Sequence, residues 1–179
     1  MEFEVSAEAK DKRLNRRVAI TVVILSVVMG LGNIKDGNIV QAMDQAQAQS
    51  VDLWNEYQAT RTKLRMTEIA EAQLTALHAP ASARFAADAD RYRAEAPRLA
   101  GAATAASARY DALNRHDDQF DASEALIATA VSVSAVAALA ESGWLLAVAW
   151  AFGACGLFLS LCGFAGWAFH PAVFSTLLG

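Results

Sequence analysis

Basic residues are missing from the last third of the chain, although the chain contains 15 Lys and Arg residues. No Lys or Arg follows Arg115, and after Glu124 the only charged residue is Glu141. Charged residues make up 19% of the 179-residue chain and hydrophobic residues 55%, whereas soluble domains have about 25% charged residues. The shortage of charge in the C-terminal part predicts membrane segments there and excludes an ordinary soluble domain.

Cysteine is scarce, and its placement excludes a disulfide scaffold. Cys155 and Cys162 lie seven residues apart inside an apolar run. On a helix this spacing separates them by about 10 Å along the axis, which is too far for a disulfide. We therefore interpret both as small packed residues. The net charge is −4, and no basic patch of the kind that binds nucleic acid is present.

Motifs of known catalytic chemistry are also absent. The chain has no glycine-rich phosphate loop and no nucleophile elbow, and its three histidines lack partners at metal-ligand spacing. We therefore predict neither enzyme activity nor a cofactor. One alternative is a divalent cation held by His116, Asp117, Asp118 and Asp121, because imidazole and carboxylate ligands cluster there. We favour a solvated charged stretch.

The first apolar run covers residues 18–34, which contain no charged side chain. Its length is at the short end for a transmembrane helix, but Arg17 and Lys35 can snorkel outward and extend it. The basic segment 1–17 before it also fits a signal peptide, and Val28 and Gly30 suit a cleavage site. We expect an uncleaved anchor. Five basic residues precede the run: Lys10, Lys12, Arg13, Arg16 and Arg17.

Residues 35–122 are polar overall and carry a repeat typical of a coiled coil. Positions in alternating steps of four and three residues define a seam between residues 36 and 78. A break follows near residues 78–82, because Pro80 disfavours helix at the residue before it and Ser82 can cap the next helix. The seam positions are Ile39, Met43, Ala46, Ser50, Leu53, Tyr57, Thr60, Leu64, Thr67, Glu71 and Leu74.

After the break the repeat continues as one mostly bulky row and one mostly alanine row. Small residues in the second row allow two helix backbones to approach closely. Pro97 lies off the seam, so we expect a local kink there. Two stretches of about 40 residues joined by a short turn predict an antiparallel coiled-coil hairpin; the alternative is helix-prone linkers. The rows are Phe85, Tyr92, Leu99, Ala106, Leu113 and Phe120, and Ala89, Ala96, Ala103 and Tyr110.

Two further spans are predicted at residues 123–141 and 144–169. The sequence from Asp121 to Glu124 has the pattern of a capping box and should start the second span. Ala130, Ser134 and Ala138 form a row of small residues that favours close helix packing in lipid. We expect a turn after Glu141, an end to the third span at His170–Pro171, and an apolar tail at 170–179 along the membrane surface.

The predicted fold class is therefore an all-α membrane protein. It has three transmembrane helices and a long antiparallel helical hairpin between the first and the second. The concentration of basic residues before residue 18 places the N-terminus in the cytoplasm by the positive-inside rule. The hairpin then lies outside the cytoplasm, in the periplasm if the membrane is a bacterial inner membrane.

A family resemblance rests on two stretches that follow the first span. The sequence KDGNIVQAMDQAQA covers residues 35–48, and WNEYQA covers residues 54–59. These stretches resemble the bacterial DUF4337 family of membrane proteins, most strongly over about residues 10–70. The resemblance implies a basic N-terminus, a short span, a coiled helix, and paired spans near the C-terminus in a bacterial membrane. It implies no particular activity.

The candidate contact residues lie on the hairpin and on the second span. Gln41, Gln45 and Gln49 form an amide stripe that can bond across subunits, or an ordinary polar helix surface. Trp54 and Tyr57 either pack inside the hairpin, which we favour, or anchor a partner.

We expect a structural or accessory protein that self-associates, or joins a larger membrane complex, through the hairpin and the small-residue faces. The alternative is an oligomeric channel or transporter component, with a polar ring of Ser132, Ser134, Ser160 or the amide stripe.

Overall fold

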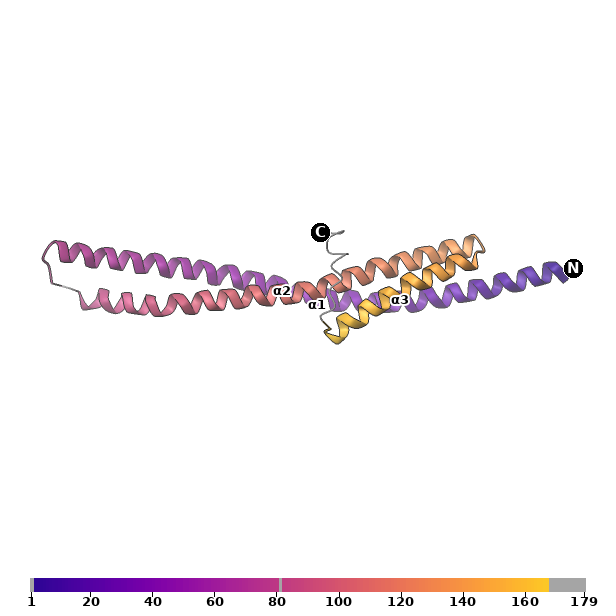
Figure 1. Ribbon diagram of the computed structural model, residues 1–179, viewed down its shortest axis with the longest axis horizontal. Coiled ribbons are helices and arrows are strands. Elements are labelled where there is room, and N and C mark those ends of the chain that lie inside the picture. The colour runs from indigo at the N-terminus through magenta and orange to yellow at the C-terminus, as the bar shows by residue number, and fades with distance from the viewer. Residues whose placement is uncertain (1, 81, 168–179) are drawn as a thin grey trace. The chain divides into compact units, whose positions relative to one another are not determined.

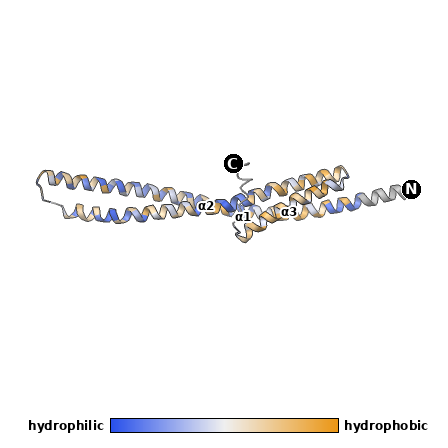
Figure 2. Ribbon diagram, in the orientation of Figure 1, coloured by the Kyte–Doolittle hydropathy of each residue, from blue (hydrophilic) through white to orange (hydrophobic). Residues whose placement is uncertain are grey.

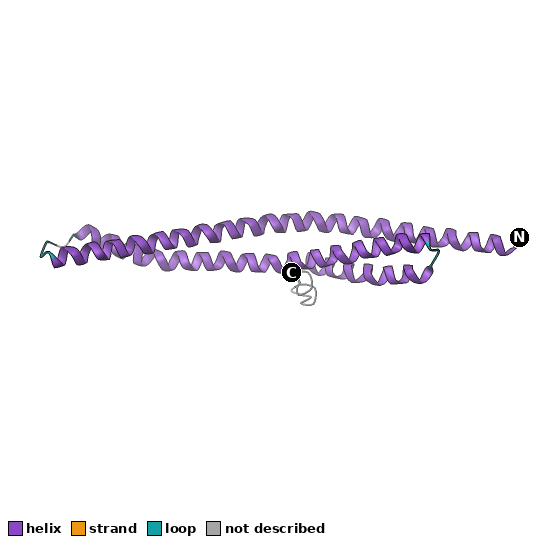
Figure 3. Cartoon of the chain, turned by 90° about the horizontal axis from the view of Figure 1, so that it is seen from above, coloured by secondary structure: helices purple, strands orange, loops and turns teal. Residues whose placement is uncertain are grey.

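The computed structural model describes residues 2–80 and 82–167, with side chains described from residue 11 onward. The described chain is helical: α1 covers Glu2–Ala76, α2 covers Ala83–Leu139 and α3 covers Gly143–Ala165 (Figure 1). Short turns join the three helices (Figure 3). Each helix contains a segment long and apolar enough to cross a membrane, which confirms the all-helical class and the three apolar segments.

The second helix starts far earlier than its apolar segment does. It continues through Pro97 and through Asp121–Glu124 without a break, so the predicted capping box does not start a helix. A capping side chain is effective only where the preceding residues have left the helical conformation. No proline or glycine lies between Gly101 and Ser142, so nothing interrupts the helix at that point.

A residue in the left-handed conformation follows the end of each helix: His78 (φ 53°) after α1, Glu141 (φ 51°) after α2 and Gly166 (φ 68°) after α3. At each end two amides bond back to carbonyls three and five residues earlier, the Schellman pattern. The third helix therefore ends at Ala165, not at residue 169, because Gly166 readily adopts positive φ. His170, Pro171 and the tail lie outside the described residues.

The chain divides into two compact units, Met1–Val40 with Leu113–Gly179, and Gln41–Ala112. We call the second the hairpin unit. Its segments of α1 and α2 pack antiparallel, joined by a 2.8 Å bond between the Ser50 and Ser107 hydroxyls and a 3.0 Å ion pair between Glu68 and Arg93. Burial follows the seven-residue repeat: Ala46, Ala89 and Ala103 are at most 1% exposed.

The first unit, called here the bundle unit, packs α3 against apolar parts of α1 and α2 (Figure 2). Two buried clusters form its core. One contains Val18, Ala137 and Leu146, and the other contains Leu25, Ile127 and Ala130. The outward face of α1 is apolar and suits contact with lipid, with five large side chains each more than half exposed: Ile20, Val23, Ile24, Val27 and Leu31.

Glycines on α3 allow α2 to approach closely. A Cβ on Gly156 would lie 2.7 Å from Ile127 Cγ1 and 3.1 Å from the carbonyl oxygen of Ser123, which is backbone. A Cβ on Gly163 would lie 2.9 Å from the Phe120 ring. The contact therefore depends on the absence of side chains at these positions.

Gly156→Ala should lower the free energy of unfolding by about 1–3 kcal/mol, because the added methyl group must displace α2. The measurement is unfolding of the detergent-solubilised protein by SDS, followed by circular dichroism. Gly30→Ala is the matched control, since nothing lies within 4 Å of its added Cβ. Equal losses in the two variants would contradict the packing.

His78→Gly should raise the free energy of unfolding by roughly 0.5–1 kcal/mol, because glycine relieves the cost of the left-handed conformation. Ala76→Gly, two residues earlier and inside α1, should lower it by about the same amount. Thermal unfolding followed by circular dichroism compares both with wild type. The same sign of change in both variants would argue against the observed helix end.

Candidate functional site

A layer of acidic side chains lies at the end of the bundle unit, next to its apolar core. It is built by Asp36 on α1 and by Asp117, Asp121 and Glu124 on α2. We call these four residues the acidic layer. Asp117 and Asp121 lie one helical turn apart on α2, so both side chains are on the same face. Asp36 approaches this face from α1, and its carboxyl group raises the pKa of Asp117.

The Asp36–Asp117 contact joins two carboxyl groups. The pKa of Asp117 is raised from 3.8 to about 7, first by burial and then by the neighbouring carboxyl group of Asp36 and the charges of Asp121 and Asp118. The Oδ1 atoms of Asp36 and Asp117 are both buried, and no ordinary donor among the described residues reaches them. Two carboxyl groups can bond to each other only when one carries a proton.

Asp121 has the same kind of environment. Burial raises its pKa, and the charges of Asp36, Glu124 and Asp118 act in the same direction. Every charge that shifts Asp117 or Asp121 is negative. The layer is therefore a site of concentrated negative charge that, together with burial, favours the protonated form of Asp117 and Asp121.

Asn33 connects the acidic layer to the core. In its bonded orientation its amide nitrogen donates to Glu124 Oε2 at 3.2 Å and to the Met29 carbonyl at 3.0 Å. A pocket of about 10 Å³ lies beside it, lined by all three helices and including Ser123 and Ser160. That is close to the room needed by one water molecule.

Neighbouring residues of α2 fasten this end of the bundle unit to α3. The Gln119 side chain is 1% exposed, and its amide nitrogen donates to the Trp167 carbonyl at 2.9 Å. The Ser123 hydroxyl donates to the Gly156 carbonyl at 2.8 Å. The rings of Phe120 and Phe164 meet edge to face with centroids 5.2 Å apart. The acidic layer therefore lies next to a region where α2 and α3 are tightly packed.

The divalent-cation alternative is not supported by the arrangement of these groups. Among residues 2–80 and 82–167, no three His, Cys, Asp or Glu side chains are grouped to hold a metal ion. His116 lies with its Nδ1 3.3 Å from the Oε1 of Gln119.

Sequence reasoning had grouped Asp117, Asp118 and Asp121, but it missed Asp36 and Glu124. The antiparallel hairpin contained the signal needed to find them. In an antiparallel hairpin, residues that are equally far in sequence from the turn lie opposite each other. With the turn at Pro80, Asp36 is expected opposite the stretch from Asp121 to Glu124. Asn33 and Glu124, which are hydrogen-bonded, also lie at similar sequence distances on either side of Pro80.

The predicted contact residues of the hairpin unit differ in exposure. Gln41, Gln45 and Gln49 are exposed. Trp54 is 38% exposed and meets the half-buried ring of Tyr57 edge to face, with centroids 5.5 Å apart. The two residues therefore differ: Tyr57 packs at the seam between the helices, whereas part of the Trp54 side chain is exposed.

The small-residue row of the second span faces the interior of the bundle unit. Ala130 and Ser134 are fully buried, and Ala138 packs against the cluster around Val18. Ser160 is also buried, whereas Ser132 is exposed. These three serines therefore do not line one surface, and a ring shared between subunits would have to come from Ser132 or the amide stripe.

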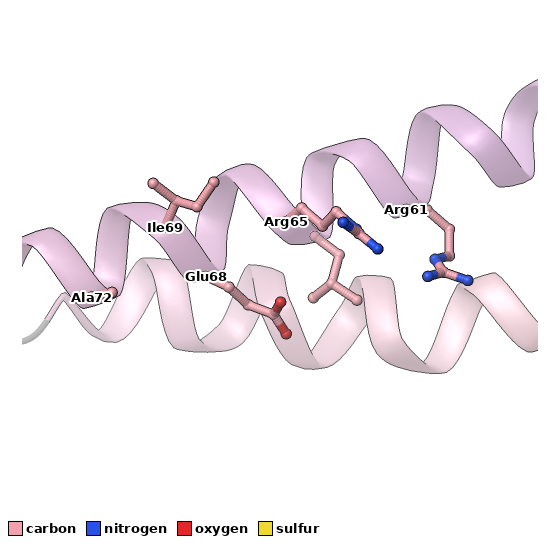
Figure 4. A pocket seen from close by; sticks show the side chains of 6 residues that line it. Arg61, Arg65, Glu68, Ile69 and Ala72 are labelled. Carbon is pink, nitrogen blue, oxygen red and sulfur yellow. The ribbon is translucent and has the colours of Figure 1, made fainter.

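A hollow of about 440 Å³ on the hairpin unit is lined by α1 alone (Figure 4). Arg61, Arg65 and Glu68 stand at its edge, and Glu68 is paired with Arg93 of α2. Arg61 donates to the Tyr57 hydroxyl at 2.9 Å. With one helix as its wall, the hollow is a surface feature and encloses no ligand.

Comparison with known proteins identified one family. The sequence model of the family described as "Domain of unknown function (DUF4337)" matches residues 14–166. The match covers most of the chain and confirms the resemblance seen in residues 35–59. No curated protein matches the chain, and no solved structure matches it.

Gln119→Leu should lower the free energy of unfolding by about 1–3 kcal/mol, because it leaves the Trp167 carbonyl without its donor. Gln73→Leu is the control, since Gln73 is exposed on α1 and should change stability by less than about 0.5 kcal/mol. SDS unfolding in detergent measures both. An unchanged Gln119→Leu variant would show that the bond contributes nothing.

Proposed function

Since the chain belongs to the DUF4337 family, whose description assigns no activity, we propose a function from its own residues: a membrane-anchored assembly protein. In this proposal the three apolar segments cross a bacterial inner membrane, and the hairpin unit joins copies of the chain. The basic residues before Val18 orient the N-terminus toward the cytoplasm. The hairpin unit then lies in the periplasm.

The observation that carries the proposal is the exposed apolar surface of the hairpin unit. Its seam residues face inward and are buried or half-buried within the chain, so they are occupied in each copy. Nevertheless Val51 is 52% and Trp54 38% exposed, and their spacing of three residues puts them on one face of α1. We call these two residues the outer patch. A tryptophan held by an aromatic neighbour is a common anchor of protein interfaces.

A second copy of the chain is the partner we favour. The bond between Ser50 and Ser107 sets which residues of α1 and α2 lie at the same level of the hairpin. In this register Asp52 on α1 and Arg109 on α2 are separated by about one helical turn along the axis of the hairpin. Both are exposed, and neither forms an ion pair within the described part of the chain. Copies rooted in one membrane would bring these opposite charges together.

The amide stripe supports the same proposal. Gln41, Gln45 and Gln49 make no side-chain hydrogen bond within the described residues. Exposed amides at a spacing of four residues can bond to a matching stripe on another helix. The buried Ala130 and Ser134 are occupied within the chain, so contacts between copies would use outward faces.

Trp54→Ala should reduce the mass of the particle extracted gently in detergent, or weaken its association by about tenfold or more, because an interface anchor is worth about 2 kcal/mol or more. Trp144→Ala is the matched control, since Trp144 is 69% exposed in the bundle unit. Native mass spectrometry gives the masses, and circular dichroism confirms helicity.

The masses also distinguish the partners. A multiple of 19.1 kDa in wild type that falls in Trp54→Ala supports self-association. A foreign protein released by Trp54→Ala would make the chain a subunit of a larger complex. A monomeric wild type would contradict the proposal.

A further inference from the structure

The pairing of two acidic side chains between helices is unusual for a contact that holds a protein together. Asp36 on α1 and Asp117 on α2 are both partly buried, each with a buried Oδ1 atom that has no hydrogen-bond partner. About one helical turn away the same two helices meet, where a Cβ on Gly32 of α1 would lie 3.8 Å from the Phe120 ring of α2. Two carboxylates placed together repel each other, whereas a carboxylic acid and a carboxylate form a strong hydrogen bond. The contact therefore attracts or repels according to one proton.

We propose that the Asp36–Asp117 pair is a proton-dependent latch between α1 and α2. With one proton, the pair bonds the two helices. Without it, two negative charges face each other and loosen the helices at this level. The latch concerns a different site from the outer patch, so it does not depend on the assembly proposed above.

The surroundings of the pair strengthen its response to protons. The groups acting on Asp117 are Asp36 from α1 and Asp121 and Asp118 from α2. Glu124 adds its charge at Asp121. The third helix of the bundle unit, Gly143–Ala165, has no charged residue. Loss of the proton therefore adds negative charge to a region that is already negative.

A change in the charge of the pair should alter the packing of α2 on α3. Phe120 lies three residues after Asp117 and packs against Phe164 and the surface of Gly163. Ser123 follows with its bond to the Gly156 carbonyl. Since α2 is one continuous helix, a shift at Asp117 strains these contacts first.

The direction of the pH dependence follows from proton linkage. In the folded protein the pKa of Asp117 is raised from 3.8 to about 7. Between these values the folded chain holds a proton that the unfolded chain has released, so its stability falls as the pH rises. The contribution is fully present below the lower value and fully lost above the higher one.

The test compares thermal unfolding of the full chain in lipid nanodiscs at pH 5.5 and pH 8. The wild-type unfolding temperature should be higher at pH 5.5 by about 3–6 °C. Asp117→Asn should lose most of this difference and be more stable than wild type at pH 8, because an amide can donate to Asp36 without a titrating proton. Asp44→Asn, which removes an exposed carboxylate from α1, should keep the difference.

Infrared spectroscopy gives a second and independent readout. The carbonyl band of a protonated carboxylic acid should be present at pH 6, disappear as the pH rises to 8, and be absent in Asp117→Asn. If Asp117→Asn does not accumulate in folded form, Asp36→Asn carries the same expectations. An equal pH difference in wild type and Asp117→Asn, or no protonated band at pH 6, would overturn the latch.

Discussion

The small residues along the buried face of α2 set the distance at which the other helices can pack. In the hairpin unit this face consists largely of alanine, including Ala89, Ala96 and Ala103. In the bundle unit it continues as Ala130, which lies opposite Gly153 of α3, and as the buried Ser134. Close backbone approach provides dispersion contacts that do not depend on water, so it works both in lipid and outside it. One uninterrupted helix therefore packs closely against α1 in the hairpin unit and against α3 in the bundle unit.

Close packing also explains the position of the acidic layer. Where the apolar core of the bundle unit ends, the Phe120 and Ser123 contacts hold α2 against α3, and the Phe120 ring also lies against Gly32 of α1. Acidic side chains at that level cannot move apart into solvent as they would on separate helices. Burial and the neighbouring negative charges raise the pKa of Asp117 and Asp121, and the same contacts make the packing sensitive to their charge. The proposed latch therefore depends on the same close packing of helices around α2.

Much of the fold could be predicted from the sequence, because hydrophobic periodicity reports directly on burial. The three apolar segments and the positions of the turns followed from runs of residues and from Pro80 and Glu141. The prediction that the capping box begins a helix was wrong, because α2 continues through Asp121–Glu124. A capping box is a local pattern, and only the conformation of the preceding residues decides whether a helix begins. The end of α3 was placed too late because Gly166 ends the helix before His170.

The site was harder to predict, because it depends on the pairing of helices. Asp117 and Asp121 stood out as a local cluster, but Asp36 lies far away in sequence and joins them only through the antiparallel register. The small row at Ala130 and Ser134 is buried within the chain. Its partner within the same chain became evident only from the glycines of α3.

The most direct test of the assembly function is cysteine cross-linking in intact membranes. Val51→Cys would be introduced into a chain carrying Cys155→Ser and Cys162→Ala, with Glu56→Cys, an exposed position on another flank of α1, as the control. Our account predicts an oxidised dimer for Val51→Cys, formed much faster than for Glu56→Cys. Equal slow formation at both positions, with no discrete product, would contradict the outer patch as the surface that joins copies of the chain.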